Sequence, residues 1–197
     1  MTDNSDTLKA SRIRATQSLF RAAGVPSTCW DVSASKTGRP YLRTNARIWA
    51  NDEERGSIRP GMYFYGPVEE QQETVALAAK EAILAGVDAL HTSYHMLAMR
   101  LPAWQRAEGN PDVDYPLNML FGRGLLAIHT IPPAYSITEQ EGRLHMDALA
   151  WIISHVDHGG LLAICGDHPL QGRNSMETEW PGELLLPLRR YCNVYEV

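Results

Sequence analysis

Three short polar segments follow apolar runs and could carry chemistry. The first is residues 69–74, rich in Glu and Gln, which follow an aromatic run and Gly66. His129 and Thr130 end a second apolar run, and Asp167 follows a third. Carboxylates and imidazoles are common general acids, general bases and metal ligands. These residues form one candidate site if the three apolar runs are neighbouring strands.

A metal site is the first alternative for the histidines. The candidate ligands are His129, His145, His155, Asp157, His158 and His168. The His155 and His158 pair closes a predicted helix, with no cysteine or carboxylate at a known third-ligand spacing. Cationic side chains are also favoured at helix C-termini, so solvated or capping histidines explain the pattern. We therefore predict no bound metal.

A hydrolase is the second alternative, with Ser93, Asp167 and His168 as nucleophile, acid and base. Such enzymes present the serine on a Gly-x-Ser-x-Gly turn. That motif is absent from the sequence, which argues against this function.

The elements around these residues predict an α/β fold. Short apolar runs predict strands at 62–65, 87–92, 124–129, 161–165 and 192–195. Helical periodicity, a capping box at Thr138 and Glu141, and stop residues predict helices at 8–23, 44–54, 72–85, 93–101, 138–158 and 182–191. Wholly apolar strands that alternate with helices indicate a parallel sheet covered on both faces. Ligands of such sheets bind at the carboxyl ends of the strands, here residues 66–74, 129–133 and 166–169.

Composition is that of an ordinary globular protein. The 197 residues suit a single domain, with 44% hydrophobic and 21% charged residues and a net charge of -5. This balance excludes a strongly basic, sequence-independent nucleic-acid binder. Three well-separated cysteines indicate reduced, buried thiols, and no leader or membrane-spanning run is present. We expect a cytoplasmic protein that does not bind membranes.

Several segments resemble one family in order and spacing. They are Ala23–Pro26, Gly61–Ala78, Leu125–Ile128, Leu162–Asp167 and Leu184–Val194. Together they resemble the ATPase domain of the bacterial helicase loaders DnaC and DnaI and the transposition ATPase IstB. The resemblance implies a RecA/AAA+-like P-loop NTPase core at 23–197, a three-layer parallel sheet without a lid domain. Residues 1–22 would be an N-terminal helix with a frayed tail over 1–7.

The resemblance also identifies the positions of the family's phosphate loop, which here have lost their chemistry. They are Gly66, Glu69, Glu70, Gln71, Gln72, Glu73 and Thr74. Gln72 stands at the position of the lysine, Glu73 at the first hydroxyl, and Glu69 and Gln71 at two glycines. Phosphate loops need glycine flexibility, a lysine and a hydroxyl. Carboxylates here would repel a polyphosphate, so ATP and magnesium binding is expected to be lost.

The remaining catalytic positions of the family are also changed. His129 and Thr130 replace the two Walker B acids, and Asp167 replaces the sensor asparagine. Pro187 falls near the position of the arginine in the last helix. These changes predict a pseudo-ATPase rather than an enzyme.

We expect such a protein to bind a replicative helicase, a helicase loader or a related ATPase subunit in a phage or mobile element, and to recruit or inhibit it. The family's helicase-binding domain is not expected at full size, because few residues precede Gly24. Candidate contacts with a partner or DNA are Arg12, Arg14, Arg21, Arg189 and Arg190. Two alternatives are a divergent ATPase completed by a partner's Lys or Arg, and a single-stranded-DNA accessory protein. The latter could stack bases on Tyr94, Trp104 or Trp151.

Overall fold

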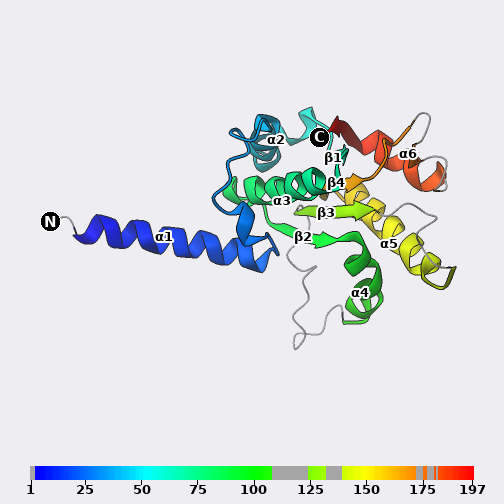
Figure 1. Cartoon of the computed structure of the whole chain (residues 1–197), viewed down its shortest axis with the longest axis horizontal. Coiled ribbons are helices and arrows are strands. Elements are labelled where there is room, and N and C mark those ends of the chain that lie inside the picture. The colour runs from blue at the N-terminus through cyan, green and yellow to red at the C-terminus, as the bar shows by residue number, and fades with distance from the viewer. Residues whose placement is uncertain (1–2, 108–123, 132–138, 172–174, 177–179, 181) are drawn as a thin grey trace.

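A five-stranded parallel sheet forms the centre of the molecule. The computed structural model describes residues 3–107, 124–131, 139–171, 175–176, 180 and 182–197 (Figure 1). The strands are β1 (Gly61–Tyr65), β2 (Ala89–Ser93), β3 (Leu125–Ile131), β4 (Leu161–Gly166) and β5 (Cys192–Glu196). They lie in the order β2-β3-β4-β1-β5, and every neighbouring pair is parallel. The predicted parallel α/β sheet is thus confirmed.

Helices cover both faces of this sheet. They are α1 (Asp3–Ala22), α2 (Pro40–Ala50), α3 (Val68–Leu84), α4 (Tyr94–Ala107), α5 (Glu139–Asp157) and α6 (Gly182–Tyr191). Two 3-10 turns, η1 (Ser27–Cys29) and η2 (Arg55–Ser57), join them. Side chains alternate along β1: Met62 and Phe64 pack with α2 and α3, whereas Tyr63 packs with α4, α5 and α6. The result is the expected three-layer architecture.

Helix α1 projects from the body of the molecule (Figure 1). It begins at Asp3, and the expected fraying of the tail over residues 1–7 stays a prediction. The predicted buried face holds only at the C-terminal end, where Phe20 is 3% exposed, whereas Ile13 is 50% exposed. Most of α1 therefore leaves its apolar side chains in solvent.

Helices α2 and α4 differ from their predicted boundaries, and α2 also ends at Ala50 rather than at Glu54. Helix α2 begins at Pro40 rather than Thr44, because proline suits the first position of a helix. Helix α4 continues past the expected stop at Pro102 and ends at Ala107. Leu97 and Leu101 are almost fully buried, so packing keeps this segment helical despite the hydrogen bond that proline removes.

The three cysteines are free and buried, as predicted: Cys29, Cys165 and Cys192. Among the described residues, no helix combines the length and the apolar character needed to cross a membrane.

Candidate functional site at the carboxyl ends of the strands

The segment after β1 is a helix, which corrects the expected loop. Helix α3 begins at Val68, four residues before the predicted start at Gln72. Residues 69–73 therefore lie in its first turns. Glu and Gln favour helix, and no glycine interrupts the segment. Glu69 and Glu70 also suit the positive end of the helix dipole.

Gly66 forms the turn into α3 for a reason unrelated to phosphate. Its φ is +143°, and a Cβ there would lie 2.1 Å from the carbonyl oxygen of Val197. The backbone N–H of Val197 donates to Tyr65 O at 2.9 Å. The chain's last residue therefore packs against this turn, and only glycine leaves room for it.

Polar side chains of the first turns bond to their own backbone. Gln71 is fully buried, and its Nε2 donates to Gly66 O. The Thr74 hydroxyl donates to Glu70 O at 2.6 Å. These bonds stabilise the start of α3, while the buried Gln71 Oε1 has no hydrogen-bond partner among the described residues.

Arg39 pairs with two of the carboxylates. Its guanidinium lies 3.6 Å from Glu70 Oε2 and 3.6 Å from Glu73 Oε2, and its side chain is only 12% exposed. Arg39 was not among the predicted site residues. The spacing of four residues from Arg39 to Arg43 and from Arg43 to Arg47 is a signal that sequence reasoning missed.

A cavity of about 420 Å³ lies beside the start of α3 and the ends of β2 and β3. It is lined by Pro26, Thr28, Cys29, Glu69, Gln72, Glu73, Ala76, His91 and His129. No lysine or arginine is among these lining residues. The charged groups of the lining are the carboxylates of Glu69 and Glu73.

Two stacked imidazoles form one wall of this cavity. The rings of His91 and His129 are 5.1 Å apart between centroids, with 25° between their planes. Burial lowers the pKa of both, and burial followed by the neighbouring His129 lowers that of His91 to about 4. The Nδ1 of His91 lies 3.0 Å from Gly24 O. The pair is therefore neutral at pH 7, and His91, near the end of a predicted strand, was another residue that sequence reasoning missed.

The structure brings Thr130 to the start of α3. The Gln72 amide donates to the Thr130 hydroxyl at 3.4 Å. Thr130 has φ +60°, at an irregularity in the β3–β4 pairing, and its N–H donates to Cys165 Sγ at 3.1 Å. A positive φ is uncommon for a β-branched residue and is often found at functional sites.

Asp167 and the remaining hydrolase candidates do not join the cavity. Asp167 follows β4, and its buried Oδ1 has no hydrogen-bond partner in the described part of the chain. The Ser93 hydroxyl accepts a bond from the backbone N–H of Met96 at 3.1 Å, as a helix cap does. Residues 132–133 of the predicted site lie outside the described residues.

The histidines proposed as metal ligands contact the backbone instead. His155 Nε2 lies 3.2 Å from both Gly124 O and Leu161 O, and His158 Nδ1 lies 2.7 Å from Ser154 O. His145 packs its ring against Tyr94. Among the residues that the structure describes, no three His, Cys, Asp or Glu form a possible metal site.

The predicted arginine contacts are dispersed. Arg14 bonds to Ala10 O along α1, and Arg21 lies over the Trp30 ring. The Arg189 guanidinium donates to Leu170 O at 3.0 and 3.2 Å, and Arg190 lies over the Tyr191 ring.

Arg12 is exposed on α1, and none of the five arginines lines the cavity.

Tyr94 is fully buried, with its hydroxyl bonded to His145 O, so it cannot stack on a base. Trp104 and Trp151 are partly buried against the core.

Comparison with known proteins identifies the fold. No family model matches the chain, and no curated protein matches it. Among solved structures, the crystal structure of the DnaC helicase loader matches with a TM-score of 0.55 and 12% identity. The match covers 90% of this chain and 98% of that one. The protein therefore shares its fold, a parallel α/β sheet covered by helices on both faces, with the DnaC helicase loader.

Proposed function

We propose that this protein is a catalytically inactive, loader-like pseudo-ATPase that binds a replicative helicase, a helicase loader or another ATPase subunit. The observation that carries the proposal is the start of α3. Helical turns bearing Glu69, Glu70 and Glu73 stand at the positions of the phosphate loop, and Arg39 pairs with two of these carboxylates.

The helix removes the means of binding phosphate. A phosphate loop directs several backbone N–H groups at its ligand, whereas here the N–H of Gln71 already bonds to Pro67 O at 3.0 Å. Only the first-turn N–H groups remain, beside carboxylates. Two like charges about 4 Å apart repel by roughly 4 kcal/mol at an effective dielectric of 20. Nucleotide binding is therefore disfavoured.

The residues expected to act in hydrolysis are equally unsuited. His129 and Thr130 offer no carboxylate to hold magnesium or to position water. His129 is neutral at pH 7 because burial lowers its pKa. We expect a protein that keeps the fold without these catalytic carboxylates to act by binding other proteins through its surface.

The exposed part of α1 offers such a surface. Leu8, Ile13 and Leu19 are 59%, 50% and 56% exposed, beside the basic Arg12 and Arg14. Exposed apolar side chains next to arginines are typical of protein interfaces. We assign the partner contact to this helix.

The nucleotide half of the proposal is tested by titrating fluorescent ATP with magnesium into the protein. We expect no saturable binding in the micromolar range and no phosphate release. Micromolar binding at the cavity, lost when His91 is replaced by Trp, would instead support a divergent ATPase.

The partner half is tested by affinity capture from the organism that encodes the chain, followed by reconstitution with the purified helicase and loader. Leu8→Glu with Leu19→Glu should abolish the interaction. The matched control is Met96→Glu with Met99→Glu, which alters exposed apolar residues of α4. Recovery of unrelated metabolic enzymes alone, or equal loss in both variants, would contradict the proposal.

A further inference from the structure

Helix α2 carries a row of arginines with unequal partners. Arg39 is the N-cap residue of α2, and Arg43 and Arg47, four residues apart within the helix, lie on one side of it. Arg39 meets the carboxylates at the start of α3. Arg43 and Arg47, one and two turns later, face the end of α3 and have no carboxylate within 4 Å among the described residues. The cationic row thus continues beyond its matching acids.

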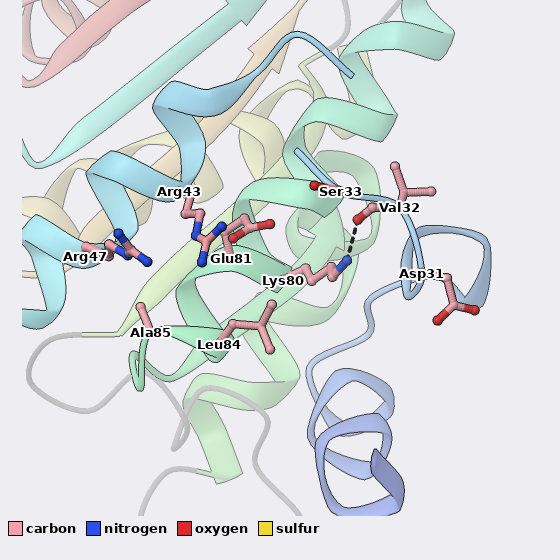
Figure 2. Close-up of a pocket in the computed structure, with 9 residues that line it drawn as sticks. All are labelled: Asp31, Val32, Ser33, Arg43, Arg47, Lys80, Glu81, Leu84 and Ala85. Carbon is pink, nitrogen blue, oxygen red and sulfur yellow. Dashed lines mark hydrogen bonds between the residues drawn. The ribbon is translucent and has the colours of Figure 1, made fainter. Parts of the chain in front are cut away.

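A pocket lies at this unmatched end. Its volume is about 300 Å³, and it is lined by Asp31, Val32, Ser33, Arg43, Arg47, Lys80, Glu81, Leu84 and Ala85 (Figure 2). The charged groups of the lining are the three cations Arg43, Arg47 and Lys80 and the carboxylates of Asp31 and Glu81. The pocket is therefore cationic in a protein with a net charge of -5.

Lys80 provides a buried donor in this pocket. Its side chain is 6% exposed, and its ammonium group donates to Val32 O. An ammonium group has three N–H donors, so two remain after this bond. A buried cation is stable when an anion or further acceptors complete its shell. The carboxylates of Asp31 and Glu81 do not fully balance Lys80 and the two arginines, so one positive charge is left over.

We propose that this pocket binds a phosphate group. A phosphate anion would be attracted by the excess of positive charge, and its oxygens suit the planar guanidinium groups of Arg43 and Arg47. The volume suits a phosphate with a few waters or a phosphate on a larger molecule. This inference is independent of the proposed function, because the pocket lies near the opposite end of α3 from the nucleotide-loop positions.

The experiment titrates inorganic phosphate and pyrophosphate into the full chain at low salt by calorimetry. We expect saturable binding, weakened about tenfold by Arg47→Gln, since one charge-assisted bond is lost. Glu81→Gln should tighten binding severalfold because it removes the repelling carboxylate. The matched control is Arg100→Gln, which removes an exposed arginine from α4 and should leave the affinity unchanged.

Two further arms identify the source of the phosphate. Labelled oligothymidylate that competes with phosphate and depends on Arg47 indicates a nucleic-acid backbone. Phosphate binding without such competition indicates a free phosphate or a phosphate monoester. No saturable binding, equal weakening by Arg100→Gln, or binding only of a glutamate-rich peptide would overturn the proposal. ATP binding that survives in Arg47→Gln would instead contradict the proposed loss of nucleotide binding.

Discussion

Single side chains determine what the site at the strand ends can accept. Arg39, with a side chain 12% exposed, neutralises part of the charge that Glu70 and Glu73 introduce. His91 and His129 remain neutral beside them. One side of the site therefore has carboxylates that are already paired with Arg39. The other side has the uncharged rings of His91 and His129.

Replacing Arg39 tests this internal pairing. Arg39→Gln should lower the free energy of unfolding by about 1 kcal/mol, because both carboxylates lose a partly exposed ion partner. Urea unfolding at low and high salt measures the effect, which should shrink as salt screens the pair. In a variant that already carries Glu70→Gln and Glu73→Gln, Arg39→Gln should lower the free energy of unfolding only slightly. An equal cost in both backgrounds would show that Arg39 acts through packing alone.

His91 should make stability depend on pH. Its pKa is about 4 in the folded chain against an ordinary value of 6.5, so the unfolded chain binds more protons between these values. The free energy of unfolding should therefore fall as pH drops from about 6.5 to 4, by up to about 3 kcal/mol. His91→Gln should flatten this dependence in urea melts. His158→Gln is the control and should leave the slope unchanged.

At the scale of elements, the important feature is the early start of α3. Gln72 lies exposed within the helix and provides a direct test. Gln72→Gly should cost about 1 kcal/mol relative to Gln72→Ala, as glycine does inside helices. Thermal and urea unfolding of the two variants measure this difference. A neutral glycine would indicate that the segment is a loop in solution.

Much of the fold could be predicted from sequence because strands and stop residues are local signals. Gly61 begins β1, Gly66 follows that strand, and Gly86 follows α3. The loop at 69–73 was expected from the resemblance to a phosphate loop. The segment is helical instead because its residues have a high local helix propensity. Arg39 escaped prediction because its pairing depends on how α2 lies on α3, which no local pattern reveals.

At the scale of the whole molecule, α1 is held to the body by few contacts. Phe20 is 3% exposed and lies 6.3 Å from the Trp30 ring. Phe20→Ala should lower the free energy of unfolding by about 3 kcal/mol. Ile13→Ala, at a 50% exposed position, should change it by less than about 0.5 kcal/mol. Urea unfolding of both variants checks the contrast, and a large effect of Ile13→Ala would mean that α1 folds back on the body.

The projection of α1 also sets a distance. An α-helix rises 1.5 Å per residue, so Leu8 stands roughly 20 Å along the axis from the end of α1 at Ala22. A partner that binds the N-terminal part of α1 around Leu8 would not contact the sheet. The helix would then hold the bound partner at a distance from the sheet. Both the cavity at the strand ends and the pocket beside Arg43 and Arg47 would stay accessible to other ligands.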